Sequence, residues 1–353
     1  MKEIKFGNRL IENYTAPYII AEIGANHNGD MNLAREMITS AKENGADCVK
    51  FQSWTNKSLI AREEYDRNQT YNDSKKKHFG SLLEMVTKYA LTNDQHRELK
   101  DFCDDLGIDF ASSPFSVEEA ALLNSMDVPF LKIASMDINY LSFLEKAAQF
   151  GKPMIISTGM STLSEIDKAV ETCYKAGNTQ VILLHCISIY PPEYEDIHLR
   201  NITTLQNTFG LPVGFSDHTI GTSIPLASAA LGACVIEKHF TTDKDLPGWD
   251  HEISADPEEL KIISDGTKHI SASLGSYKRT VSKAEEAKKL KFRRSLVLTK
   301  DVDPGHILTE EDLVAKRPGT GIPPDQLNSV IGMQVNSKIS DDELLQWNHL
   351  KAQ

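Results

Sequence analysis

Short apolar runs recur at regular spacing along roughly the first two thirds of the chain. Each run ends in polar residues or glycine, and helical patterns such as the apolar set Leu33, Ala34, Met37, Ile38 and Ala41 lie between them. Near-continuous apolar runs without strict alternation are typical of strands that are buried on both faces, as in a parallel sheet. The eight runs are Tyr18–Gly24, Cys48–Ser53, Phe110–Phe115, Phe130–Ser135, Met154–Gly159, Val181–Ser188, Pro212–His218 and Cys234–Thr241.

Eight strands that alternate with helices over about 250 residues predict an α/β fold with a closed (β/α)8 barrel, or TIM barrel. An open doubly wound sheet is the structural alternative, and it would need a G-x-G-x-x-G turn after the first strand. The segment Gly24–Gly29 reads Gly-Ala-Asn-His-Asn-Gly and does not match that turn. We therefore predict a catalytic barrel domain over residues 1–275.

The composition changes after Gly275. Residues 276–292 form a basic connector, which we predict to be helical with a solvated face. Beyond it, Ser295–Leu298 is a predicted strand, Asp301–Gly305 a turn, and Thr309 the capping residue of a helix. Residues 293–353 therefore make a small second domain.

Composition and charge narrow the class of protein. The chain has 353 residues, 40% of them hydrophobic, and a net charge of −12. These values exclude a disordered or collagen-like chain, and the acidic balance argues against a nucleic-acid binder or a protein of anionic membranes. The start of the chain is charged, and Ile224–Ile236 is too short and interrupted to span a bilayer. Five widely spaced cysteines without a C-x-x-C pair indicate reduced thiols, so we expect a cytoplasmic protein.

Polar residues end almost every predicted strand. In a barrel of this kind the chemistry lies at the carboxyl ends of the strands, so these positions carry the candidate site. Their neighbours within the strands are apolar, which argues against a surface role for the whole set. The main candidates are Glu22, Lys50, Gln52, Ser113, Lys132, Ser135, Ser157, Ser188, Tyr190, Ser216, His218, Glu237 and His239.

Two lysines and several hydroxyls in this set form a predicted anion pocket. Lys50 and Lys132 end two different strands, and serines end others. A lysine is a point-charge donor to phosphate, and the contact is stronger in a low-dielectric interior. The pocket therefore fits a small phosphate-bearing substrate.

Two histidines end the last two strands, which are adjacent in a closed barrel. Imidazoles from neighbouring strands can bind one divalent cation and leave positions open for water and substrate, so His218 and His239 are candidate metal ligands. With oxygen as the remaining ligands we expect Mn²⁺, with Mg²⁺ or Co²⁺ as alternatives. A hydrogen-bonded pair without metal is the competing interpretation. Glu22 and Glu237 supply carboxylates that act as bases or orient a ligand.

Two further features have both a functional and a structural interpretation. His185 lies in the middle of a predicted strand, where a hydrogen-bonded core histidine is the better interpretation. The acidic loop Asp243–Glu252 offers Asp250 to sugar hydroxyls, or is merely solvated.

Taken together and in order, these motifs resemble the N-acetylneuraminate (sialic acid) synthase family, which includes the legionaminic and pseudaminic acid synthases. The resemblance covers nearly the whole chain, and the set is specific although no single motif is. The motifs are Glu22–Gly29, Val49–Gln52, Ser113–Phe115, Lys132–Ser135, Ser157–Met160, Gly214–His218, Glu237–Phe240 and Lys316–Gly319.

The resemblance implies a (β/α)8 barrel followed by a small antifreeze-like (SAF) domain, and a domain-swapped homodimer in which that domain covers the partner's site. It implies a metal-dependent transferase that condenses phosphoenolpyruvate with N-acetylmannosamine or a related N-acyl hexosamine. The products are a nine-carbon 2-keto acid and phosphate.

The resemblance also implies roles for individual residues. Glu22 is the catalytic carboxylate, His218 and His239 bind the metal, and Ser113 and Glu237 support the site. The implied phosphoenolpyruvate contacts are Lys50, Lys132, Ser135, Ser157, Ser188 and Ser216. The implied sugar contacts are Gln52, Tyr190, Asp250 and Arg317, the last of which reaches across the dimer.

Some residues depart from the family pattern around the sugar. Phe51 and Ser188 stand where enzymes for N-acetylmannosamine commonly carry His and Asn. Phe51 favours a deoxy sugar if it lines the pocket, and carries no such information if it lies in the barrel wall. Two other functions stay open: a phosphoenolpyruvate-dependent aldol-type synthase for a phosphorylated aldose, and a non-catalytic carbohydrate-binding scaffold. The first would need extra cations at the mouth, where the loop Asp245–Glu252 is acidic.

Overall fold

The computed structural model describes residues 3–69 and 80–351. Residues 1 and 2, part of the charged start, lie outside the described residues. Contacts divide the chain into a barrel unit, residues 1–275, and a C-terminal unit, residues 276–353.

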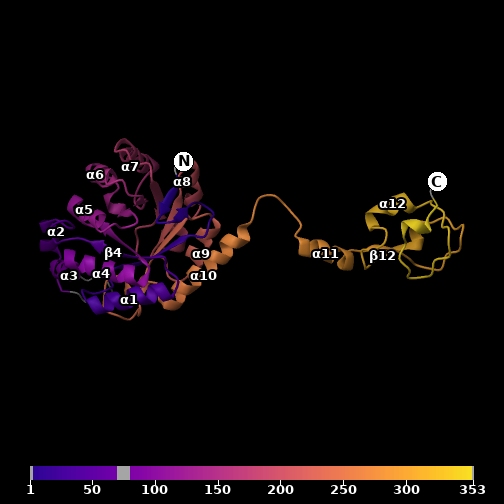
Figure 1. The fold of residues 1–353 in the computed structure, drawn as a ribbon, viewed down its shortest axis with the longest axis horizontal. Coiled ribbons are helices and arrows are strands. Elements are labelled where there is room, and N and C mark those ends of the chain that lie inside the picture. The colour runs from indigo at the N-terminus through magenta and orange to yellow at the C-terminus, as the bar shows by residue number, and fades with distance from the viewer. Residues whose placement is uncertain (1–2, 70–79, 352–353) are drawn as a thin grey trace. The chain divides into compact units, whose positions relative to one another are not determined.

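Eight parallel strands form the centre of the barrel unit, with helices around them (Figure 1). Their order is β5-β4-β3-β10-β9-β8-β7-β6, and β5 and β6 at its two ends pack against each other and complete the ring. The predicted (β/α)8 barrel is therefore confirmed. The strands are β3 (Tyr18–Gly24), β4 (Cys48–Ser53), β5 (Asp109–Pro114), β6 (Leu131–Ile133), β7 (Met154–Ser157), β8 (Val181–Cys186), β9 (Val213–Asp217) and β10 (Val235–His239).

Some strands end earlier than their apolar runs predicted. β6 and β8 end at Ile133 and Cys186, so Ser135 begins the 3-10 turn η1 (Ser135–Asp137) and Ser188 lies in a loop. The Ser135 hydroxyl accepts a hydrogen bond from Gly159 N (3.1 Å), which replaces the strand ladder at this point. The chain thus leaves the sheet where side chains turn to the barrel mouth.

Helix α1 (Met31–Glu43) shows how the intervening patterns fold. The Asp30 side chain caps it by accepting hydrogen bonds from Asn32 N and Leu33 N. Of the predicted apolar set, all members but the partly buried Leu33 are buried against the barrel. The other helices of this unit are α2 (Arg62–Arg67), α3 (Leu82–Tyr89), α4 (Asn93–Leu106), α5 (Val117–Ser125), α6 (Leu141–Gln149), α7 (Leu163–Lys175), α8 (Asn201–Phe209), α9 (Ser223–Ala230) and α10 (Pro257–Leu274).

A hairpin of β1 (Ile4–Phe6) and β2 (Arg9–Ile11) covers the amino ends of the barrel strands. The Phe6 ring lies 5.0 Å from the ring of Tyr18 and 4.8 Å from that of Phe130, centre to centre. Because aromatic residues fill this end, access to the barrel interior is from the carboxyl ends of the strands.

The C-terminal unit has its own apolar core around Leu296, Val302 and Ile339. The predicted strand Ser295–Leu298 is β11, which pairs antiparallel with β12 (Leu313–Lys316). Thr309 caps only the 3-10 turn η4 (Glu310–Asp312), so the predicted helix there is a single turn. The remaining elements are η5 (Pro324–Gln326), α12 (Leu327–Val330) and η6 (Trp347–His349).

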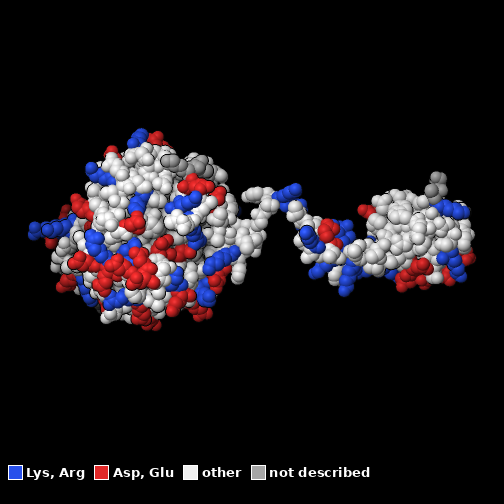
Figure 2. Space-filling model, in the orientation of Figure 1, with Lys and Arg blue, Asp and Glu red and all other residues white. Residues whose placement is uncertain are grey.

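The basic connector is helical only in part. Helix α11 (Lys283–Phe292) begins where Ser282 and Glu285 form a capping box, so the prediction of a helix from residue 276 onward is wrong for residues 276–282. No residue of α11 is buried, in agreement with a solvated face, and its lysines are part of the blue surface in Figure 2. Among the described helices of both units, none has the length and apolarity to cross a bilayer.

Candidate active site

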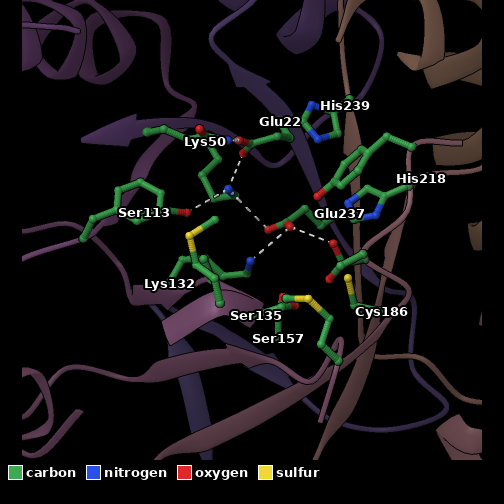
Figure 3. Close-up of a pocket in the computed structure, with 18 residues that line it drawn as sticks. Glu22, Lys50, Ser113, Lys132, Ser135, Ser157, Cys186, His218, Glu237 and His239 are labelled. Atoms are coloured by element: carbon green, nitrogen blue, oxygen red, sulfur yellow. Dashed lines mark hydrogen bonds and ion pairs between the residues drawn. The ribbon is translucent and has the colours of Figure 1, made fainter. Parts of the chain in front are cut away.

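A cavity of about 280 Å³ lies at the carboxyl ends of the barrel strands (Figure 3). The structure brings together there most of the residues that the sequence singled out. The predicted residues that line it are Glu22, Lys50, Gln52, Ser113, Lys132, Ser135, Ser157, Ser188, Tyr190, Ser216, His218, Glu237 and His239. The cavity settles their position, and the roles assigned to them stay predictions.

The alternation of side chains along each strand explains this convergence. Ser216 and Glu237 point into the barrel, whereas their strand neighbours Phe215 and Ile236 belong to the core between strands and helices. The same alternation places Lys50 inside and Phe51 outside, where the Phe51 ring stacks 5.6 Å from that of Phe110. Phe51 therefore lies in the barrel wall, and the suggestion that it favours a deoxy sugar fails.

The two lysines are paired with carboxylates rather than free. Lys50 Nζ forms an ion pair with Glu22 and lies 3.7 Å from Glu237 Oε2, while Lys132 Nζ lies 3.2 Å from Glu237 Oε1. The hydroxyl of Ser113 accepts a hydrogen bond from Lys50 (3.0 Å). Two cations and two anions thus balance one another in the buried site, which the interpretation as a simple anion pocket had not included.

The two carboxylates have opposite pKa shifts. Burial raises the pKa of Glu22 to about 7, because the opposing effect of Lys50 is too weak to cancel it. Burial also acts to raise the pKa of Glu237, but the charges of Lys132 and Lys50 outweigh it and lower that pKa to about 2. Near neutral pH, therefore, Glu237 holds a fixed charge and Glu22 exchanges a proton, the arrangement that separates an acid–base group from a structural one.

Serine hydroxyls converge on the loop that follows β7. A Cβ added to Gly159 would lie 2.3 Å from Ser188 Oγ and 2.8 Å from Ser135 Oγ, so only glycine fits there. The buried Ser157 Oγ has no hydrogen-bond partner among the described residues. These hydroxyls are available to oxygen atoms of a ligand.

The two histidines lie side by side, with ring centres 5.6 Å apart, and the Tyr190 ring lies 4.1 Å from that of His218. His218 Nδ1 donates a hydrogen bond to Ile187 O (2.7 Å), since a carbonyl only accepts. Burial and the neighbouring His218 lower the pKa of His239 well below its ordinary value. Although burial opposes it, contact with Cys186 raises the pKa of His218, so the pKa values of the two imidazoles shift in opposite directions.

This donor set fits a divalent ion held by two imidazoles. His218 and His239 are the residues that would hold such an ion, since imidazole nitrogens are common ligands of divalent metals and the two rings lie 5.6 Å apart, centre to centre. His239 Nδ1 is buried without a hydrogen-bond partner among the described residues, and Asp250 Oδ2 lies 3.8 Å from it. Residues 3–69 and 80–351 contain no group of three or more His, Cys, Asp or Glu arranged as a metal cage. The remaining ligands of such an ion would be oxygens of water or substrate.

Two predicted residues lie outside the cavity lining. Asp250 Oδ2 lies 3.8 Å from His239 Nδ1, and burial raises the pKa of the Asp250 carboxyl to about 6. Arg317 belongs to the C-terminal unit, where its guanidinium lies 5.1 Å from the centre of the Phe292 ring. His185 is a core histidine as expected, because its Nε2 donates to Ile197 O (2.6 Å).

The cavity also has lining residues that the sequence had not assigned to it: Phe115, Ala134, Met136, Met160 and Cys186. Although burial alone would raise it, the contact with His218 lowers the pKa of the Cys186 thiol. Spacing was the available signal for this residue, since alternation along β8 places Cys186 on the same side as Ile182 and Leu184, which lie in the barrel interior. The methionines lie in loops, where no periodicity indicates direction.

Comparisons with known proteins identify the family of the chain. A model of the NeuB family matches residues 37–279 and a model of the SAF domain matches residues 293–351. The chain is 39% identical to N,N'-diacetyllegionaminic acid synthase of Legionella pneumophila over 95% of each protein. It is 36% identical to human N-acetylneuraminate-9-phosphate synthase, over 93% of this chain and 91% of that protein.

A solved structure shows the same fold. It is the crystal structure of N-acetylneuraminic acid (sialic acid) synthetase from Leptospira borgpetersenii serovar Hardjo-bovis in complex with citrate. The TM-score is 0.71 at 36% identity, over 81% of this chain and 95% of that one. The barrel, the C-terminal domain and these relatives agree with the resemblance found in the motifs, and the chain belongs to the NeuB family of sialic acid synthases.

Proposed function

We propose that this protein is a nonulosonate synthase that condenses phosphoenolpyruvate with an N-acyl hexosamine, N-acetylmannosamine or a related sugar, as a C–C bond-forming transferase. The observation that carries the proposal is the juxtaposition of two buried lysines, several serine hydroxyls and two histidines in one cavity. The named relatives support it, since they are synthases of legionaminic acid and of N-acetylneuraminate 9-phosphate.

The lysine side of the cavity fits phosphoenolpyruvate. Lys50 and Lys132 supply positive charge, and Ser135, Ser157 and Ser188 supply hydroxyl donors to phosphate and carboxylate oxygens. Glu237, with its low pKa, is the anion that pairs with both lysines and holds them in place. These residues hold the substrate before any bond changes.

The reaction then joins C3 of phosphoenolpyruvate to the aldehyde carbon of the open-chain sugar. The π electrons of the aldehyde move to its oxygen, which takes up a proton and becomes a hydroxyl. Water adds to the cationic C2 and gives one proton to the ionised Glu22 carboxylate. The bond from C2 to the phosphate oxygen then breaks, the second proton of that water leaves with the phosphate, and the 2-keto group forms. A divalent ion at His218 and His239, Mn²⁺ in the first place, would supply Lewis-acid polarisation of the aldehyde oxygen. Gln52 donates a hydrogen bond to Glu22 Oε1 (3.1 Å) and so fixes the carboxylate that takes the proton.

The mouth of the cavity favours a sugar without phosphate. Phe115, Met136 and Met160 are apolar, and among the described residues the lining contains no lysine or arginine besides Lys50 and Lys132, which are paired with carboxylates. Apolar side chains suit the methyl groups of N-acyl substituents, whereas a second phosphate would need a cation. Tyr190, Gln52 and Asp250 complete the proposed sugar side, together with Arg317 from the partner in a domain-swapped homodimer. The five free, buried cysteines support a cytoplasmic location.

The test measures phosphate release from phosphoenolpyruvate by metal-stripped protein, with Mn²⁺ or EDTA and a panel of sugars. The panel contains N-acetylmannosamine, 2,4-diacetamido-6-deoxy hexoses, arabinose 5-phosphate and erythrose 4-phosphate. We expect release with one N-acyl sugar only, and its loss in EDTA. Release with a sugar phosphate would establish the aldol-type alternative, and no release with any sugar would favour the scaffold.

Two substitutions test the assigned roles. His218→Ala should abolish turnover while the fold is retained, and unchanged turnover would exclude it as a metal ligand. Arg317→Ala should weaken sugar binding with little change for phosphoenolpyruvate. Mixed dimers of Arg317→Ala and Glu22→Ala subunits should regain activity, and failure to do so would contradict a site shared between subunits.

A further inference from the structure

A buried ion pair lies on the outer side of the barrel wall, directly behind the two histidines. Lys238 Nζ lies 2.6 Å from Asp217 Oδ2, and the side chains are 2% and 0% exposed. The same strand faces otherwise carry apolar residues such as Phe215 and Ile236, which pack in the core under the helices. The catalytic cavity does not include either member of the pair.

The pair is tied to the backbone next to each histidine. Asp217 Oδ1 accepts hydrogen bonds from Thr219 N (3.0 Å) and Thr219 Oγ1 (2.8 Å), which closes a turn around His218. Lys238 Nζ donates a second hydrogen bond to Thr219 O (2.5 Å). Lys238 immediately precedes His239, so one group of contacts holds the residues beside both imidazoles.

His218 needs such a device because it lies one residue beyond the end of β9. The register of the sheet pairs Asp217 with Lys238, and no strand pairing of β9 extends past that point. Beyond the ladder, the turn that Asp217 closes with Thr219 determines where the His218 backbone lies. An apolar pair in this position would pack but would not bind Thr219.

Stability alone is a weak reason for this arrangement. A buried ion pair loses the hydration of both charges, and apolar replacements of similar volume often leave stability unchanged or increased. Groups behind metal-binding histidines, in contrast, fix ring orientation and metal affinity. Asp217 and Lys238 directly precede His218 and His239 in the chain, so they are placed to fix the orientation of these histidines.

We propose that Asp217, Lys238 and Thr219 form a clamp that sets the spacing of His218 and His239 for divalent-ion binding. This inference rests on the proposed function of the two histidines. The three are positioning residues, since they act through the imidazoles and touch no substrate.

The test replaces both charges at once, in Asp217→Leu/Lys238→Met, so that no unpaired charge is left in the core. The first readout is the imidazole ¹H–¹⁵N NMR signal of His218 in metal-free protein, which reports the hydrogen bond from Nδ1 to Ile187 O. His185, whose Nε2 bonds Ile197 O, is an internal reference in the same spectrum. We expect the His218 signal to shift or broaden while the His185 signal stays unchanged.

The second readout is the affinity of metal-stripped protein for Mn²⁺, measured from the EPR signal of the free ion. The double variant should bind at least about tenfold more weakly, the usual effect of removing groups behind metal ligands. Asn178→Ala is the matched control, because Asn178 is equally buried and bonds Ala148 O and Lys152 O at the amino end of β8. It should lower stability and leave both readouts unchanged.

A His218 signal that is unchanged in the double variant overturns the clamp, whatever happens to Mn²⁺. If the parent protein binds no Mn²⁺, the metal part of the proposed function fails instead. The NMR comparison still decides the clamp in that case, because it needs no metal. The two failures are therefore distinguishable.

Discussion

Glu237 is the group on which the charge balance of the cavity depends, and Glu237→Gln tests that balance. The substitution keeps the shape of the side chain, and an amide oxygen can still accept from Ser216 Oγ, which lies 2.9 Å from Glu237 Oε1. It removes the negative charge that faces Lys132 at 3.2 Å and Lys50 at 3.7 Å. Both lysines are buried, so their charges then lack compensation.

The size of the effect follows from these distances. With an effective dielectric constant of about 20, each contact corresponds to roughly 5 kcal/mol of Coulomb energy. Removing the carboxylate charge also removes the cost of desolvating it, which offsets part of this Coulomb energy. The net cost of breaking a buried pair by removing one partner is about 3–5 kcal/mol. We expect that loss in the free energy of unfolding of the barrel unit. A bound anion should restore most of it, since saturation to about 1,000 times Kd adds about 4 kcal/mol.

The assay is urea unfolding at pH 7.5 with and without phosphate or phosphoenolpyruvate, followed by tryptophan fluorescence and circular dichroism. Trp54 and Trp249 report the barrel unit and Trp347 the C-terminal unit. Ser113→Ala is the control, because it removes one hydrogen bond to Lys50 and no charge. It should cost about 1 kcal/mol and leave the anion effect unchanged.

The reasoning is refuted by either of two results. One is a Glu237→Gln protein within about 1 kcal/mol of the parent in the absence of anions, below the cost expected for breaking a buried pair. The other is equal stabilisation of parent and variant by phosphate, which would mean that Glu237 does not compete with the ligand for the lysines.

Three further predictions concern single residues. In the parent, kcat/KM should rise as the pH increases through about 7, because the ionised Glu22 accepts the proton. Glu22→Gln should lose this pH dependence and most of its kcat. If the rise in kcat/KM persists in the variant, it belongs to another group. Gly214→Ala should destabilise the barrel by about 1–3 kcal/mol in thermal unfolding, since a Cβ would lie 2.5 Å from Val235 O. In the C-terminal unit, burial opposes ionisation of Asp312, but hydrogen bonds and the ion pair with Lys300 outweigh it and hold the pKa of this carboxyl below its usual range. The contribution of Asp312 to the free energy of unfolding is therefore present above about pH 4 and is lost as the pH falls further. Asp312→Asn should lower the transition of that unit alone, and an equal fall in the barrel transition would contradict this.

The strands of the barrel were predictable because burial on both faces leaves a continuous apolar run. Tyr18–Gly24 and Cys48–Ser53 agree with the observed bounds. The direction of Phe51 was also within reach of the sequence, since alternation from an inward Lys50 requires it to point outward. Loop residues such as Met160 follow no period, so their position at the mouth could not be inferred.

The ion pairs depended on a different kind of information. Glu22 meets Lys50 because the register of β3 and β4 places them opposite each other. Register depends on the packing of whole strands, and a list of polar strand ends does not contain it. The sequence therefore indicated most of the polar residues that line the cavity and missed that its lysines are already paired.

This pairing has a consequence for substrate binding. Lys50 holds the pKa of Glu22 below the value that burial alone would produce. When an anion takes the charge of Lys50, that effect weakens and the negative ligand adds to it, so the pKa of Glu22 rises further above 7. At pH 7–7.5, binding of phosphoenolpyruvate should therefore be accompanied by proton uptake.

Calorimetric titration with phosphoenolpyruvate in buffers of different ionisation enthalpy measures that uptake. The parent protein should take up a fraction of a proton per site. Glu22→Gln should take up less, and the difference is the part of the uptake that is due to Glu22. Uptake that persists in full in Glu22→Gln would belong to the phosphate of the substrate, and heats independent of the buffer would mean that Lys50 stays with Glu22. In the expected case, binding of phosphoenolpyruvate causes Glu22 to take up a proton. The carboxyl must release that proton before it can accept one from water. On the acid side of the pH profile, kcat should therefore be limited by this release.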